Sequence, residues 1–197
     1  MSDAAPATVL ELGHPALRQR CTPVGPGAPT PEQRAHAAAL QATLAAFRAA
    51  RGFGRGIAAP QIGVPLRLVA LDLGARPYPD GGTGPLQLWD PAVTWRADET
   101  FTLWDDCMSF PTLLVRVRRH TSLSLAFRDG DGRERRWERV DRALAELLQH
   151  ELDHLDGVLA LDRAEPAAPG VDAVVTRGAW EADRERFRAQ VDYAIGE

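Results

Sequence analysis

The sequence predicts a single α+β domain in which mostly antiparallel or mixed strands surround one central helix. Its 197 residues suit one domain with a sizeable core. Two well-delimited helix patterns, at about 31–50 and 142–155, bracket a stretch that extends to Glu138 and is rich in strand and turn patterns. Helices that lie outside a run of strands, rather than alternating with them, are typical of the α+β class.

The first helix follows a loop rich in proline and glycine. Thr30 is a favourable N-cap, Pro31 suits the first helical position, and Gln33 completes a capping box. The helix is expected to reach about Ala50, where the sequence RGFGRG ends it. The apolar residues that share one face of this helix are Leu40, Leu44 and Phe47.

Strand patterns occupy the middle of the chain. The short apolar run LRLVALDL (66–73) is typical of a buried strand, whereas residues 86–95 and 113–127 alternate in part between apolar and polar side chains. The sequence RDGDGR (Arg128–Arg133) is a hairpin turn signal, and residues 135–140 form the return strand.

The second helix is expected to begin after Asp141, an effective N-cap, and to extend from about Arg142 to Leu155 before Gly157. Residues 164–172 are predicted to form a loop. A last amphipathic helix is predicted over about 176–197, so that the whole chain, 1–197, is one domain. The side chains expected on the apolar side of that helix are Trp180, Phe187, Val191 and Ala194.

Composition limits the classes of function. The formal net charge of −4 and the pI of about 5.8 argue against general binding of nucleic acid. The two cysteines form no C-x-x-C motif, which argues against a disulfide framework and favours a reducing cytoplasm. The N-terminus has no signal-peptide pattern, and no apolar run is long enough to cross a bilayer, so no membrane association is expected.

The segment QHELDHLDG contains the pattern H-E-x-x-H in His150, Glu151 and His154. On a helix, residues four apart share a face, so both imidazoles can be directed at one metal ion. Glu151 lies about 100° further around the helix, where its carboxylate can reach a water on that ion without being a ligand. A bound divalent ion lowers the pKa of its water toward neutrality. The alternative is that both histidines are ordinary core or surface residues.

The third metal ligand is the open question. Cys107, within WDDCMSFP, offers a thiolate that zinc and ferrous iron bind strongly; the alternative is a small buried apolar residue. No histidine follows His154, so a downstream ligand would have to be Glu181 or Glu185, as in a metallopeptidase. Cys21 has no comparable neighbours and is expected to be structural. Alongside the helix motif, we favour Cys107.

Two further groups are candidates for supporting roles. Gln61, within GRGIAAPQIG (Gly54–Gly63), offers a carboxamide N–H to a developing oxyanion. Asp153 is either a solvated charge or a group that orients a ligand histidine or pairs with Arg118 or Arg119.

Taken in order and at these separations, three segments resemble the motifs of peptide deformylases. GRGIAAPQ (Gly54–Gln61) and QHELDHLDG (Gln149–Gly157) match the family patterns GxGxAAPQ and QHExDHLxG closely. DDCMS (Asp105–Ser109) is similar to EGCLS but departs from it at three positions. With ALRQRCTPV and GVLALDR added, the resemblance extends from about His14 to Arg163.

The resemblance implies a hydrolase that removes the formyl group from the N-terminal methionine of new polypeptides. It implies one divalent ion held by Cys107, His150 and His154, usually Fe²⁺ in the family, with Zn²⁺, Ni²⁺ or Co²⁺ also accepted. Glu151 would be the general base and then the general acid. The implied oxyanion donors are Gln61 and the backbone N–H of Met108. The residues implied to bind the substrate are Arg55, Gly56, Ile57 and Asp106.

The departures from the family pattern leave alternatives open. Asp106 replaces a glycine, Asp105 replaces a glutamate, and Arg55 occupies a usually apolar position. These charges favour, as an alternative, a deformylase-like enzyme for another formylated peptide or a small formamide; a further alternative is a metal-binding relative that does not catalyse. The resemblance also implies a possible partner, because deformylases of this family can dock at the ribosome through a basic C-terminal extension. Here the C-terminal arginines are interleaved with acids, which favours a solvated face and at most a transient ribosome contact.

Overall fold

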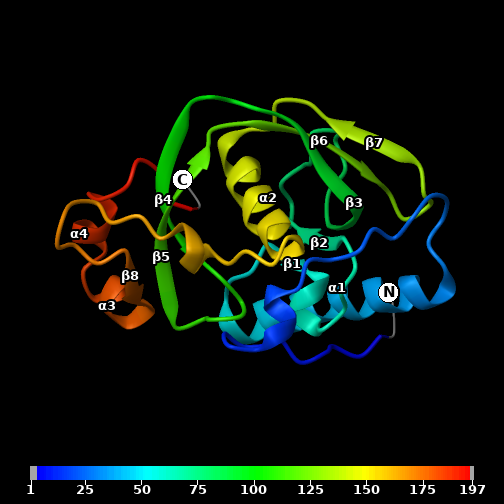
Figure 1. Cartoon of the computed structure of the whole chain (residues 1–197), viewed down its shortest axis with the longest axis horizontal. Helices are drawn as coiled ribbons and strands as arrows, with labels where there is room; N and C mark the ends of the chain where they lie inside the picture. The colour runs from blue at the N-terminus through cyan, green and yellow to red at the C-terminus, as the bar shows by residue number, and fades with distance from the viewer. Residues whose placement is uncertain (1–3, 196–197) are drawn as a thin grey trace.

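The computed structural model describes residues 4–195, which form two antiparallel sheets. The predicted α+β class is confirmed. Figure 1 shows one helix, α2 (Arg142–Leu155), between the two sheets. The strands of the larger sheet, in pairing order, are β1 (Gly56–Ala58), β2 (Leu68–Asp72), β3 (Pro85–Arg96), β6 (Leu123–Arg128) and β7 (Glu134–Trp137). The strands of the smaller sheet, in pairing order, are β4 (Thr100–Asp106), β5 (Leu113–His120) and β8 (Val174–Thr176).

Helix α1 (Pro31–Arg51) begins and ends as the sequence predicts. The Thr30 hydroxyl accepts a hydrogen bond from the Gln33 N–H, and the Gln33 side chain accepts one from the Thr30 N–H, which completes the capping box. Leu40 and Leu44 are fully buried against β1 and β2. Helix α1 therefore covers the edge of the larger sheet at which β1, the strand of the glycine-rich segment Gly54–Gly63, lies (Figure 1).

Helix α2 (Arg142–Leu155) is the centre of the fold and has the predicted bounds. Asp141 caps it by accepting a hydrogen bond from the Leu144 N–H at 3.0 Å. It ends at Leu155. Gly157, just beyond the C-cap Asp156, has a φ of +73° and lies so close to Arg18 that a Cβ there would be 2.5 Å from the Arg18 carbonyl oxygen. The residues through which α2 joins the main core are Leu144, Ala145, Leu147, Leu148, Leu152 and Leu155.

Replacing Asp141 with alanine should lower the free energy of unfolding by about 1 kcal/mol, because α2 then loses its N-cap hydrogen bond. The ion pair of Asp141 with Arg76 is largely exposed and should add little to that loss. Urea unfolding measures the change. Asp172→Ala, at an exposed loop position, is the control and should leave the unfolding curve unchanged. Equal curves for both variants would contradict the capping role.

The C-terminal segment differs from the prediction of one helix over about 176–197. It forms two short helices, α3 (Arg177–Ala182) and α4 (Arg184–Arg188), separated by Asp183, whose φ of −144° and ψ of 59° are not helical. The Asp183 side chain instead caps α4 by accepting from the Arg186 N–H, since aspartate competes well for such positions. Residues 196–197 of the predicted helix lie outside the described residues.

Within residues 4–195, no helix has the length and apolar character needed to cross a membrane.

Candidate active site

Cys107, His150 and His154 converge at the centre of the molecule. Cys107 follows the last residue of β4, and the two histidines lie one turn apart on α2. The Cys107 Sγ lies 3.3 Å from the His154 Nε2, which is 3.2 Å from the His150 Nε2. All three ligand atoms lie within 4.8 Å of one another, and all three residues are buried.

The donor set fits a metal ion. Two nitrogens that each lie about 2.1 Å from one tetrahedral ion are about 3.4 Å apart, close to the separation of these imidazoles. One thiolate and two imidazoles suit zinc or ferrous iron and leave a fourth position for water or substrate. Glu181 and Glu185, the alternative third ligands, are exposed on α3 and α4. Among the described residues, the group able to hold a metal is therefore Cys107, His150 and His154.

A buried chain of charges orients His150. Its Nδ1 donates to the Asp105 Oδ2 at 2.9 Å, and the same oxygen accepts from the Arg119 Nη2 at 3.0 Å. Arg119 also pairs with Asp153, as Arg163 does at the surface. Such a carboxylate partner fixes the ring orientation of a metal-binding histidine.

Burial acts against the charged forms of Asp105 and His150, but the ion pairs outweigh it. The positive charges of His150 and Arg119 hold the pKa of Asp105 well below its usual range, and the Asp105 carboxylate raises the pKa of His150. His154 differs: burial and the nearby His150 charge lower its pKa, and its Nδ1 has no hydrogen-bond partner among the described residues. The sequence identified Arg119 and Asp153 as candidates, but it gave Asp105 no role as the link to His150.

Glu151 is directed at the same centre. Its carboxylate is buried, and one of its oxygens, Oε2, has no hydrogen-bond partner among residues 4–195. Burial raises its pKa to about 7. Gly56 makes this position possible, because a Cβ there would lie 2.6 Å from the Glu151 Oε1. The glycine of β1 thus leaves room for an acid that can exchange a proton near neutral pH.

The Gln61 carboxamide is fixed at both ends. Its oxygen accepts from the Ala58 N–H at 2.9 Å, and its nitrogen donates to the Ser109 Oγ at 3.1 Å and lies 3.6 Å from the Cys107 Sγ. The Ser109 N–H also approaches this sulfur, at 3.4 Å. Met108 lies between Cys107 and Ser109 in the sequence, so its backbone belongs to the turn that carries the Cys107 thiolate. The two candidate oxyanion donors are therefore held in one rigid group beside Cys107.

A cleft of about 280 Å³ opens onto these groups. Its walls include Arg55, Gly56 and Asp106, but Ile57 does not line it: the Ile57 side chain is fully buried in the core beneath α1. Strand β1, which carries Gly56, is an end strand of the larger sheet and has β2 as its one neighbour. The apolar residues that line the cleft are Phe53, Met108, Leu147 and Ile195.

Two charged side chains that line the cleft, Arg55 and Asp106, are held in ion pairs. Arg55 donates to the Glu146 Oε1 at 2.5 Å, and Arg177 donates to the Asp106 Oδ2 at 2.9 Å. Burial raises the pKa of Glu146 to about 7, although Arg55 opposes this shift. Because Asp106 is paired with Arg177, its carboxylate does not face the cleft as an isolated negative charge. Glu146 is four residues before His150 on α2, and this helical spacing is the sequence signal that could have identified it.

Comparison with known proteins gives a consistent result. The family model described as polypeptide deformylase matches residues 6–169. The chain belongs to the peptide deformylase family. A peptide deformylase of Synechococcus sp. (strain CC9311) is 34% identical over 165 residues, which cover 84% of this chain and 76% of that one. One of Parasynechococcus marenigrum is 33% identical and covers 84% and 77% of the two chains.

Solved deformylase structures share the fold. A peptide deformylase of Synechococcus elongatus, in complex with actinonin, superposes with a TM-score of 0.71 at 30% identity, covering 83% of each chain. The Thermotoga maritima peptide deformylase has a TM-score of 0.70 at 27% identity and covers 82% of this chain and 99% of its own. As a member of this family, the chain is a metal-dependent hydrolase that removes the formyl group from N-formylmethionyl polypeptides.

Proposed function

We propose that Cys107, His150 and His154 hold one Fe²⁺ ion and that deformylation takes place in the adjoining cleft. The observation that carries this proposal is the convergence of one sulfur and two Nε2 atoms beside the buried Glu151, whose Oε2 has no hydrogen-bond partner within residues 4–195. When bound, a divalent ion supplies Lewis-acid polarisation and lowers the pKa of its water. Fe²⁺ is the ion that the family resemblance implies; Zn²⁺, Ni²⁺ and Co²⁺ suit the same ligands.

In this proposal Glu151 moves the proton. A pKa of about 7 lets its carboxylate accept a proton from the attacking water and return it to the leaving amine near neutral pH. Its Oε2, which no other described residue bonds, can accept a hydrogen bond from that water. The Gln61 carboxamide and the Met108 backbone N–H donate to the formyl oxygen as negative charge develops on it. Such donors are each worth about 10²–10³ in rate.

The formylated peptide binds along β1. The end position of β1 in its sheet leaves one side available for a further strand, so the backbone of Arg55, Gly56 and Ile57 can pair with an extended substrate. Asp106, paired with Arg177, borders the same cleft. The reaction belongs in the cytoplasm, where polypeptides are made. The arginines of α3 and α4 alternate with acids, which fits at most a transient contact with the ribosome.

A second candidate substrate class is a formylated peptide or small formamide whose formylated group is more polar than methionine. The observation that favours it is the Arg55–Glu146 pair, which introduces two charged side chains into a wall next to His150 and Glu151. Formate release from formyl-Met-Ala-Ser and from formyl-Gln-Ala-Ser, compared with simple formamides, separates the two classes.

Replacing Cys107 with alanine should remove the metal and with it the activity, because two imidazoles alone bind a divalent ion far more weakly. Protein purified without oxygen is assayed by elemental analysis and by formate release. Cys21→Ala is the matched control: Cys21 is also buried, but it lies in the core, and this variant should retain one metal per chain. A Cys107→Ala protein that keeps its metal would contradict the proposed ligand set.

A further inference from the structure

We propose that a pocket rich in arginine, on a face of α2 other than the one that carries the candidate metal site, binds a phosphate group. The pocket has a volume of about 320 Å³, which suits free phosphate or a small phosphate ester. Helix α2 contributes Gln149, Leu152 and Asp153 to its wall. Among the described residues, none lines both this pocket and the active-site cleft, so the inference does not depend on the proposed function.

Positive charge dominates the wall of this pocket. The arginines that line it are Arg67, Arg96, Arg118, Arg119 and Arg163. The carboxylates that pair with them are Asp105, Asp153, Asp156 and Glu165. Even when each carboxylate is set against one arginine, one guanidinium remains, although the whole chain has a formal net charge of −4. A concave wall with such a local excess of positive charge attracts anions.

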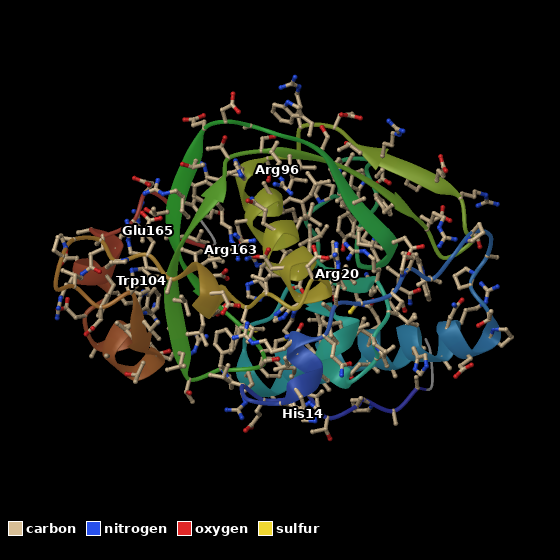
Figure 2. All side chains as sticks on the ribbon, viewed as in Figure 1. His14, Arg20, Arg96, Trp104, Arg163 and Glu165 are labelled. Atoms are coloured by element: carbon tan, nitrogen blue, oxygen red, sulfur yellow. The ribbon has the colours of Figure 1, made fainter. Side chains whose placement is uncertain are left out.

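Arg96 is the arginine without a carboxylate. It is exposed at the end of β3 and forms no ion pair or side-chain hydrogen bond with another residue of the described chain. Figure 2 shows Arg96 and Arg163 beside α2, although one ends β3 and the other follows α2 in the sequence. Arg163 uses its Nε and Nη2 on Asp153. Arg96 therefore keeps its whole guanidinium for a ligand, and this planar group can bind two phosphate oxygens at once.

A buried donor in the wall also lacks a partner. Arg119 is 3% exposed, and its two terminal nitrogens pair with Asp153 and Asp105. Its Nε, however, has no hydrogen-bond partner within residues 4–195. Buried donors without partners are rare, because leaving them unpaired costs stability. Since Arg119 lines the pocket, an oxygen of a bound anion can accept this hydrogen bond. This observation points to a ligand independently of the excess charge.

Hydrogen bonds hold the wall in place. The Gln149 Oε1 accepts from the His120 N–H at 2.9 Å, and the Gln149 Nε2 donates to the His120 carbonyl at 3.0 Å. These bonds join α2 to the end of β5, directly after Arg118 and Arg119. Arg67 donates to the Asp156 Oδ1 at 2.8 Å. A wall that is already ordered loses less conformational entropy when a ligand binds.

The carboxylates beside the pocket favour a small ligand over a long polyanion. Asp156 and Glu165 are partly exposed, with 44% and 38% of their side-chain surface accessible. They would repel the successive phosphates of a nucleic acid strand that crosses this surface, whereas a single phosphate group lies between the arginines. The proposed ligand is therefore phosphate itself or a small molecule that carries it.

The test is isothermal titration calorimetry of the metal-loaded protein, at constant ionic strength, with inorganic phosphate, glycerol 3-phosphate and a single-stranded RNA that has no terminal phosphate. We expect one phosphate or glycerol 3-phosphate to bind per chain. Tighter binding of the first identifies free phosphate as the ligand, and tighter binding of the second identifies an ester. Arg96→Glu and Arg163→Gln should each weaken this binding by about tenfold or more, because each removes charge-assisted hydrogen bonds.

Two controls locate the binding. Arg136→Glu makes the same change of charge as Arg96→Glu at an exposed position of β7 outside the pocket, and it should keep the wild-type affinity. Cys107→Ala, which lacks the proposed thiolate ligand, should also keep it, since the phosphate does not bind at the metal. Circular dichroism checks that every variant is folded.

Four results would overturn the proposal. The first is that neither phosphate nor glycerol 3-phosphate binds to the wild type, and the second is that RNA alone does. The third is equal affinity in Arg96→Glu and Arg136→Glu. The fourth is binding that Cys107→Ala abolishes and Arg96→Glu retains, which would place the anion on the metal. None of these results bears on formate release, so the proposed function is tested separately.

Discussion

Replacing Glu151 with glutamine leaves the metal in place and lowers kcat/KM for formyl-Met-Ala-Ser by about 10²–10⁴-fold. Glutamine has nearly the same shape, so it keeps the close packing against Gly56. It cannot accept a proton, and the reaction then lacks the group that carries the proton from water to the leaving amine. Because the group able to hold a metal consists of Cys107, His150 and His154, metal content should not change.

The measurement combines formate release with elemental analysis of the same preparation. Glu138→Gln, which neutralises an exposed glutamate before α2, is the matched control and should retain full activity. If Glu151→Gln turned over substrate at the wild-type rate, the proton-transfer role would have to be assigned elsewhere. If it lost its metal, Glu151 would instead contribute to metal binding.

Replacing Arg119 with methionine should lower the free energy of unfolding by about 3–5 kcal/mol. Arg119 is 3% exposed and lies between the carboxylates of Asp105 and Asp153. Methionine replaces the aliphatic stem but leaves two negative charges close together in a buried region. Without Arg119 to hold it, Asp105 should also orient His150 less well, so metal affinity should fall as well.

Urea unfolding in the presence of a chelator isolates the effect on stability from the effect on metal binding. The neighbouring Arg118→Met is the control: Arg118 is exposed and pairs with Glu165, so its loss should cost about 0–1 kcal/mol. A loss below about 1 kcal/mol for Arg119→Met would show that water or a rearranged side chain compensates the two carboxylates.

The elements with strong local signals were predictable from the sequence. Helices α1 and α2 follow from their caps and apolar spacing, and the hairpin at Arg128–Arg133 follows from its turn residues. The C-terminal segment was mispredicted because its apolar residues have helical spacing, whereas Asp183 caps a new helix and breaks the old one. Local spacing alone does not show which of two good helical signals prevails.

The candidate site was predictable where several residues lie in one motif, as in H-E-x-x-H. The roles of Asp105 and Glu146 were not predictable in the same way, because each depends on a partner that is distant in sequence: Arg119 for Asp105 and Arg55 for Glu146. From the sequence alone, a carboxylate whose partner is not known is interpreted as an ordinary surface charge. The pairings become visible only when α2 is packed against β1, β4 and β5.

The place of α2 in the chain has a consequence for biosynthesis. Strands β1 to β7 all precede Arg142, yet the apolar face of the larger sheet is covered by α2. During vectorial synthesis, Val69, Leu88 and Leu125 therefore remain without their cover until Leu155 has emerged. An interrupted chain that ends before Leu155 would expose the apolar face of the larger sheet and the Cys107 thiol. Such a chain would be bound by chaperones or degraded by proteases and would have no partial activity.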